Sequence, residues 1–293
     1  MQIERPSKQI VQSDPKKLSR EIGVEIASLC GKHFLKIKHI HYGYWPKDLE
    51  LDITNLRTAQ ERYTDFLLSN IPKDVNTIID VGCGSGQTAK RLSDAGFDVD
   101  CVSPSPLLAQ ETRDLLGKGH EIYESYYEQL QTEKRYDLVL FSESFQYMDM
   151  EIAIKKTLEL LNNGGYLLIC DIFKTDTKEH GGLISGGHRF SAFNKTIAGY
   201  PFVLSKDVDI TEYTAPNIDL ENKLFMEAAL PALGLLDQLL SSRYPLITRF
   251  MKWKNRKKID KIHTKYFSGK RTGENFKKFK SYHLLIYKKT STH

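Results

Sequence analysis

The chain has 293 residues, of which 40% are apolar, which is enough for a globular protein with a substantial core. Its net charge of +5 is unevenly placed, because residues 249–280 carry 13 lysines or arginines against Asp260 and Glu274. This basic patch predicts contact with an anionic group or a membrane surface, unless it is a solvated face of surface helices.

The sequence has few features that would direct the protein into a membrane or out of the cell. The most apolar long stretch, 224–240, is interrupted by Glu227, Pro231 and Asp237, so we expect no membrane-spanning segment. Residues 1–20 are polar and lack the apolar core of a secretory signal, which favours a cytoplasmic location, either free or peripheral at a membrane surface. The four cysteines lack the spacing of a zinc site or a disulfide framework, and no metal is predicted.

Hydrophobic periodicity predicts alternating helices and strands. The expected helices cover 18–37, 51–71, 86–96, 106–117, 150–165 and 189–199, and the expected strands cover 77–82, 98–105, 120–127, 136–144, 166–173, 202–211 and 281–289. This order predicts an α/β fold with a Rossmann-like, seven-stranded, mostly parallel sheet covered by helices on both faces. A ligand crevice should lie at the carboxyl ends of the strands.

Four parts are expected along the chain. Residues 1–48 form an N-terminal helical cap with an aromatic segment, and residues 49–212 form the Rossmann-like core. Residues 213–280 are mostly helical and carry the basic patch, and residues 281–289 return as the last strand of the core sheet. A helical excursion between two late strands predicts a lid over the crevice, with a separate small domain as the alternative.

A glycine-rich loop follows the first predicted strand, in the stretch "DVGCGSG" at 80–86. Gly82, Gly84 and Gly86 permit a tight turn and a close approach of the backbone to a ligand. A dinucleotide site has its third glycine one position later, where this chain has Gln87, so an NAD-dependent oxidoreductase is disfavoured. A turn that holds no ligand is the plain alternative.

This loop resembles the first motif of class I S-adenosylmethionine-dependent methyltransferases, and the resemblance runs from about Tyr42 to Phe173. The nearest branch is that of the tocopherol-, ubiquinone- and cyclopropane-type enzymes, which act on small molecules or lipids. The resemblance implies S-adenosylmethionine as the cofactor. It also implies that Asp80 organises the loop and that the following residues face the methionine and ribose portions: Gly82, Cys83, Gly84, Ser85 and Gly86.

The second strand departs from the usual pattern of the family. Ser103 stands where an acid normally binds the ribose hydroxyls, and Asp100 lies three residues earlier. A serine makes only a neutral hydrogen bond. A subset of the family has a hydroxyl residue followed by Ser-Pro and a nearby glutamine, and Ser103, Ser105 and Gln110 resemble that variant.

The third and fourth strands imply further contacts by the same resemblance. The acid for the adenine amino group aligns with either Tyr126 or Glu128, and we favour Glu128. Ser142 and Glu143 should border the sulfonium and the acceptor pocket.

An aromatic cluster, "HYGYW" at 41–45, precedes the first strand. Several small-molecule and lipid methyltransferases have a similar segment, which implies that Tyr42 and Tyr44 help to cover the cofactor. Aromatic faces suit a sulfonium cation. The alternative is that these rings are simply core aromatics.

A sulfonium methyl is already activated, so the protein must mainly hold the acceptor in line and exclude water. A hydroxyl or ammonium acceptor would need a base, for which His41, Glu143, Tyr147 and His188 are candidates. His180 and His188 lie in a glycine-rich loop over the site or in a surface connection. An alkene acceptor would instead need Glu143 and the aromatics to tolerate a carbocation, so O-, N- and C-methylation stay open.

The favoured acceptor is a small apolar or amphipathic molecule, such as a natural product, a prenyl compound or a lipid. The loop "FSESFQYM" after the fourth strand does not resemble the NPPY-like loop of enzymes that methylate base amino groups. Two alternatives remain: an RNA-binding methyltransferase that uses residues 249–280, and a cofactor-binding module without catalysis. The sequence does not indicate an oligomeric state.

Overall fold

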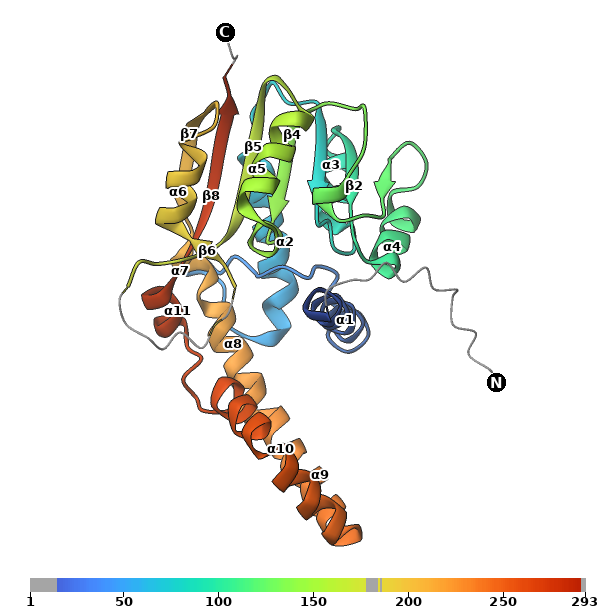
Figure 1. Ribbon diagram of the computed structural model, residues 1–293, viewed down its shortest axis with the longest axis vertical. Helices are drawn as coiled ribbons and strands as arrows, with labels where there is room; N and C mark the ends of the chain where they lie inside the picture. The colour runs from blue at the N-terminus through green and yellow to red at the C-terminus, as the bar shows by residue number, and fades with distance from the viewer. Residues whose placement is uncertain (1–14, 178–183, 185, 291–293) are drawn as a thin grey trace.

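The structure is a computed structural model that describes residues 15–177, 184 and 186–290. Its central sheet has the strand order β3-β2-β1-β4-β5-β8-β7, and β6 pairs with β5 off this path (Figure 1). The strands are β1 (Thr77–Val81), β2 (Asp98–Val102), β3 (Ile122–Tyr123), β4 (Tyr136–Ser142), β5 (Leu161–Lys174), β6 (His188–Arg189), β7 (Phe202–Asp209) and β8 (Lys280–Lys289). The strands from β3 to β5 are parallel, and β8 is antiparallel to both neighbours. The predicted mostly parallel α/β sheet is confirmed.

Helices connect the strands. They are α1 (Pro15–Cys30) with the π-helical turn η1 (Gly31–Leu35), η2 (Ile53–Asn55), α2 (Leu56–Ser69), α3 (Gln87–Asp94), α4 (Pro106–Leu116), η3 (Tyr127–Gln129), η4 (Phe145–Tyr147), α5 (Met150–Leu160), α6 (Phe190–Ile197), α7 (Thr211–Thr214), α8 (Pro216–Leu224), the π-helical turn η5 (Phe225–Ala229), α9 (Leu230–Arg243), α10 (Pro245–Tyr266) and α11 (Gly273–Phe279). Ser105 begins α4 as its N-cap, because its side chain accepts a hydrogen bond from the amide of Leu108.

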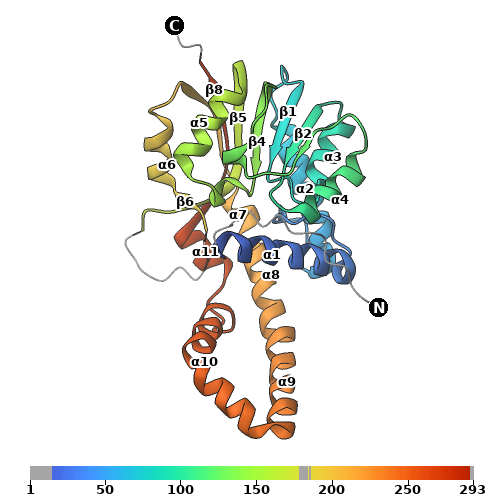
Figure 2. The ribbon, with the colours of Figure 1, turned by 45° about the vertical axis from the view of Figure 1, so that its right-hand side comes forward.

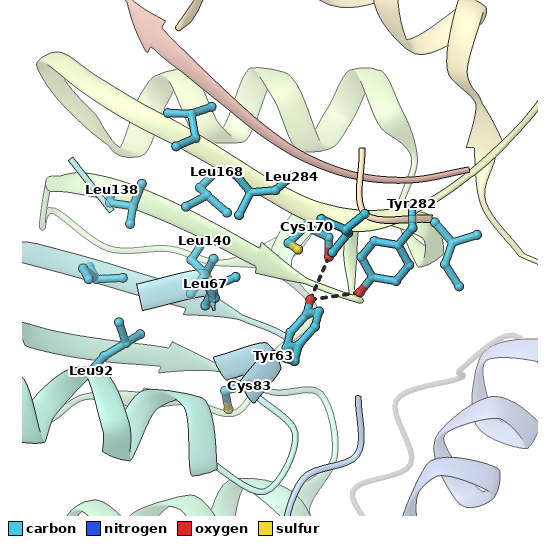
Figure 3. Packing of buried hydrophobic residues seen from close by; sticks show 14 of the residues in the cluster. Tyr63, Leu67, Cys83, Leu92, Leu138, Leu140, Leu168, Cys170, Tyr282 and Leu284 are labelled. Atoms are coloured by element: carbon cyan, nitrogen blue, oxygen red, sulfur yellow. Dashed lines mark hydrogen bonds between the residues drawn. The ribbon is translucent and has the colours of Figure 1, made fainter. Parts of the chain in front are cut away.

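Buried side chains alternate between the two faces of the sheet. Ile78 and Leu140 belong to one cluster, together with Tyr63 and Leu67 of α2 (Figure 3). Their strand neighbours Ile79 and Phe141 belong to the second cluster, together with residues of α5 and α6. Helices therefore cover both faces, as predicted.

The third strand is shorter than predicted. Residues 120–127 were expected to be extended, but β3 covers only Ile122–Tyr123. The chain then turns so that the ring of Tyr127 packs edge-on against Phe141, with a centroid distance of 5.3 Å. The Tyr127 hydroxyl lies 2.9 Å from Oγ1 of Thr157. Burial of one aromatic ring thus ends the edge strand early.

The region 213–280 does not have the expected arrangement of a lid. Figures 1 and 2 show α9 and α10 as a hairpin that extends away from the sheet, beyond the end at which α1 lies. Neither helix has a buried residue. By length and composition, the helical run Thr211–Arg243 contains an apolar window long enough to cross a bilayer, and none of that window is buried. The expectation of no membrane-spanning segment stays a prediction.

The aromatic segment at 41–45 is fastened to α8 by Asn217, which is 4% exposed. Oδ1 of Asn217 accepts from the amide of Gly43 at 2.8 Å and from Nε1 of Trp45 at 3.0 Å. Its Nδ2 donates to the carbonyls of Gly43 and Thr214 at 2.8 and 2.7 Å. One amide therefore satisfies four buried polar groups.

We expect Asn217→Ala to lower the free energy of unfolding by about 3 kcal/mol, because buried polar groups lose their partners. Urea denaturation measures this. Asn222→Ala on the same helix is the matched control, since Oδ1 of Asn222 is buried with no partner among the described residues. Equal effects of the two substitutions would contradict the assignment.

Candidate active site

A cavity lies at the carboxyl ends of β1, β2 and β4, and its wall includes Val24 of α1. It brings together most of the residues predicted from the sequence. These are His41, Asp80, Gly82, Cys83, Gly84, Ser85, Ser103, Ser105, Glu128, Ser142, Glu143 and Tyr147. The crevice therefore lies where a parallel sheet is expected to have one.

Four predicted cofactor residues do not line this cavity. The ring of Tyr44 is stacked 5.3 Å from Phe66 and 4.4 Å from Tyr213, and these contacts hold it away from the cavity. Gln110 is exposed on α4 and donates to Asp114 at 2.8 Å. Gly86 and Tyr42 also lie outside the wall. Tyr42 acts through its backbone amide, as described below.

The three glycines of the loop have positive φ angles of 76°, 58° and 77°, in chain order. A Cβ on Gly82 would lie 2.6 Å from Cβ of Ser144, and one on Gly86 would lie 2.8 Å from Cγ2 of Thr112, so both positions are set by packing. A Cβ on Gly84 would meet only Ile40, at 3.4 Å. Gly84 is therefore the glycine whose missing side chain leaves space at the cavity.

Asp80 is the penultimate residue of β1, beneath this loop, and is 1% exposed. Its Oδ2 has no hydrogen-bond partner among the described residues. Burial raises the pKa of Asp80 to about 7. A buried acceptor without a partner, in the wall of a cavity, fits a ligand that carries a hydroxyl or a positive charge.

Asp80→Asn tests whether burial raises the pKa of Asp80. In the wild type, the raised pKa of Asp80 costs stability as the pH rises from about 4 towards about 7, because the unfolded chain ionises first. We expect the melting temperature of the variant to exceed that of the wild type by a margin that grows over this range. Differential scanning fluorimetry from pH 5 to 8 measures it, with the exposed Asp98→Asn as the control. A margin independent of pH would contradict the burial argument.

Near the end of β2, Ser103 faces the cavity and Asp100 does not. Ser103 lines it and is 2% exposed. Asp100 instead accepts from Nζ of Lys134 and from the hydroxyl of Tyr136, both at 2.8 Å, and from the amide of Glu121 at 2.8 Å. Asp100 is thus occupied by partners of its own, and Ser103, which directly follows β2, lines the cavity instead.

Glu143 follows β4 with a positive φ of 57°, which few side chains other than glycine adopt. Its Oε1 accepts from the amide of Tyr42 and from the hydroxyl of Tyr282, both at 2.8 Å. Burial raises the pKa of Glu143 to about 8, although both hydrogen bonds act in the opposite direction.

A second tyrosine extends this network. The hydroxyl of Tyr63 lies 2.9 Å from that of Tyr282 and 3.1 Å from Oγ of Ser142, and Figure 3 shows the two tyrosine hydroxyls turned towards each other. Tyr63 comes from α2 and Tyr282 from β8, so sequence reasoning missed both. Their helical and strand periodicity marks them as core residues, and only the fold brings them beside Glu143.

The candidate histidines are poorly placed to accept a proton. Nδ1 of His41 donates to the carbonyl oxygen of Tyr42 at 2.8 Å. Nε2 of His41 lies 3.0 Å from Nδ1 of His39. Burial lowers the pKa of His41 to about 3, so the ring is neutral. Nε2 of His188 lies 3.2 Å from the carbonyl oxygen of Phe145, and His180 lies outside the described residues.

The remaining candidate groups are acidic or phenolic. Tyr147 lines the cavity from η4 and is 44% exposed. Glu128 lines it from η3, and the alternative residue Tyr126, which precedes η3, lines it too. Among the predicted candidates for the base, Glu143 is the one that combines a fixed position in the wall with a pKa in the neutral range.

The family described as "Methyltransferase domain" matches residues 55–268, which is more than half of the chain. The chain belongs to this family. The match includes the glycine loop, β4 and the α9–α10 hairpin. Together with its relatives, it makes the chain an S-adenosylmethionine-dependent methyltransferase, as the loop resemblance implied.

A named relative of this methyltransferase is the ubiquinone biosynthesis O-methyltransferase of Rickettsia felis. The two are 25% identical over 207 residues, which cover 64% of this chain and 84% of the relative. The relative falls within one of the branches that the sequence resembles.

Two solved structures share the fold. The geranyl diphosphate C-methyltransferase of Streptomyces coelicolor, in complex with S-adenosyl-L-homocysteine, has a TM-score of 0.66 and 15% identity over 95% of this chain and 99% of its own. A mycolic acid cyclopropane synthase has a TM-score of 0.64 and 16% identity over 92% and 98% of the two chains. At these identities the likeness supports the fold of the methyltransferase.

Proposed function

We propose that this methyltransferase moves the methyl group of S-adenosylmethionine to a small apolar or amphipathic acceptor. The observation that carries the proposal is one cavity that joins the glycine loop, the unpartnered Asp80 oxygen and the Glu143 carboxyl. The cofactor supplies the methyl group in activated form, on a sulfonium cation.

We assign the cofactor to the part of the cavity beside the loop. The missing side chain of Gly84 lets a ligand approach the backbone, and the unpartnered oxygen of Asp80 suits its ammonium or hydroxyl groups. Ser103 would bind the ribose through a neutral hydrogen bond, and Glu128 would accept from the adenine amino group. These residues fit the cofactor in number, polarity and position.

We assign the acceptor to the side bordered by Glu143. For a hydroxyl or ammonium acceptor, the ionised carboxylate takes the proton as the new bond to the methyl forms. For an alkene, the same charge stabilises the carbocation formed by methyl transfer, and the carboxylate then accepts the proton that this cation loses. Both routes need Glu143 ionised, and Tyr282 and the amide of Tyr42 hold its carboxylate in place. His41 is then a wall residue rather than the base.

The class of acceptor is supported by the relatives and by the charge pattern. The similar proteins are named for ubiquinone biosynthesis and for geranyl diphosphate, both of which involve small molecules. The basic patch at 249–280 would meet an anionic group on the acceptor or a membrane surface in the cytoplasm. An RNA acceptor, which would use the same patch, is the second candidate.

Labelled methyl transfer tests this proposal. The protein is incubated with methyl-deuterated S-adenosylmethionine and prenyl diphosphates, prenylated phenols, fatty acids or short RNA, and the products are weighed by mass spectrometry. We expect label in an apolar or amphipathic compound, and fragmentation then locates it on O, N or C. Label found in RNA alone would overturn the proposed acceptor class.

A further inference from the structure

The hairpin formed by α9 and α10 is the most exposed apolar feature of the described residues. It extends from the same end of the molecule as α1, whose Val24 lines the cavity (Figures 1 and 2). We propose that this hairpin docks the protein on an anionic lipid bilayer, with its tip inserted into one leaflet. This rests on the basic-patch part of the proposed function and is independent of methyl transfer.

The hairpin tip, residues 235–251, is largely uncharged and apolar. Its charged residues are Asp237, Arg243 and Arg249. Its large apolar side chains are exposed by 47–81%, and they are Leu235, Leu236, Leu239, Leu240, Tyr244, Leu246, Ile247, Phe250 and Met251. Many large apolar side chains exposed along one short segment mark a binding region, because water solvates them poorly.

The basic stem, residues 252–265, follows the tip along α10. It holds seven lysines or arginines and one acid, Asp260, for a net charge of +6. Trp253 stands at the boundary between tip and stem and is 73% exposed. Apolar residues at the tip, an aromatic residue at the boundary and cations behind it match the order of hydrocarbon, interface and anionic headgroups.

The dimensions fit insertion rather than crossing. Residues 245–251 rise about 10 Å along α10 at about 1.5 Å per residue. Half of a bilayer's hydrocarbon core is about 15 Å thick. The tip therefore fits within one leaflet while the stem stays among the headgroups.

Other partners explain less of this surface. A second copy of the chain would bring two stems of charge +6 together, which is unfavourable. RNA would match the stem but would leave the aliphatic tip in water. An anionic bilayer matches both parts.

Docking would also orient the cavity. The helix α8 leads into the hairpin and is joined through Asn217 to Gly43 and Trp45, beside the cavity residue His41. A docked hairpin therefore holds this border of the site in a fixed orientation relative to the bilayer. An apolar acceptor can then enter the cavity from the bilayer.

Tryptophan fluorescence of the full chain tests the docking, because the chain has only two tryptophans and Trp45 is 5% exposed. We expect vesicles of phosphatidylcholine with phosphatidylserine to shift the emission of Trp253 to the blue, and added salt to reverse the binding. Trp253→Phe should abolish the shift. Vesicles of phosphatidylcholine alone should bind weakly.

Variants separate the two parts of the hairpin. Leu246→Asp with Ile247→Asp at the tip, or Lys254→Glu with Lys258→Glu in the stem, should lower vesicle affinity about tenfold or more. The control is Ile152→Asp, because Ile152 is an apolar residue on α5 that is 48% exposed. This variant should bind vesicles like the wild type. Unchanged binding of S-adenosylhomocysteine by all variants verifies their fold.

Three results would overturn the docking: equal affinity for neutral and anionic vesicles, concentration-dependent dimers without vesicle binding, or RNA binding without vesicle binding. Vesicle binding by a protein that transfers no methyl group would instead support the docking and refute the proposed reaction.

Discussion

Gly84→Leu is expected to lower the affinity for S-adenosylmethionine by roughly 5- to 150-fold. At this position the φ angle is +58° and the added side chain would enter the cavity past Ile40. Filling a site costs about 1–3 kcal/mol, and each 1.4 kcal/mol is about tenfold in affinity. Isothermal titration calorimetry with S-adenosylhomocysteine measures the loss.

Two controls distinguish a filled cavity from a strained backbone. Gly84→Ala adds only a Cβ at ordinary contact distance, 3.4 Å from Ile40, and should weaken binding far less. Gly96→Leu places the same side chain at a φ of +96°, where an added Cβ would meet no atom within 4 Å, so it should strain the chain without affecting affinity. Unchanged affinity in Gly84→Leu would remove the loop from the cofactor site.

Glu143→Gln is expected to lower kcat by about 100-fold or more, because the amide neither takes a proton nor carries a charge. The pKa of Glu143 is raised to about 8 by burial, and the active form is ionised. In the wild type, kcat/KM should therefore rise with pH and level off above about 8. In Glu143→Gln this rise should be absent, while affinity for S-adenosylhomocysteine stays within a few-fold.

Tyr282→Phe tests the same group without removing it. The Tyr282 hydroxyl donates to the carboxylate, which favours its ionised form. Its loss should raise the pKa of Glu143 and move the rise in kcat/KM to higher pH. Tyr287→Phe is the control, since Tyr287 lies on the same strand but packs in the opposite core cluster. Identical pH profiles in all three proteins would exclude Glu143 as the titrating group.

The sheet and the loop at 80–86 could be predicted because their signals are local. A buried run, three spaced glycines and a following helix occupy consecutive positions, and backbone geometry alone fixes their arrangement. The same holds for Ser103 at the end of β2.

The rest of the site depends on contacts between distant residues. Tyr282 is 139 positions from Glu143, and nothing in either local sequence indicates their hydrogen bond. Tyr44 belongs to a cluster that suggests a cofactor cover, but it stacks against the rings of Phe66 and Tyr213 instead.

The hairpin shows the same limit at the level of an element. Its helices follow from periodicity, but periodicity does not specify what their apolar side chains contact. A lid and a projecting arm have the same pattern, and the structure distinguishes them because no residue of 213–280 lines the cavity.

Equilibrium dialysis with labelled S-adenosylmethionine is the most direct test of the cavity as a cofactor site. We expect saturable binding that S-adenosylhomocysteine displaces and NAD does not, with Gly84→Leu showing little binding at the same concentrations. Absence of saturable binding by the wild type, or displacement by NAD, would contradict the assignment.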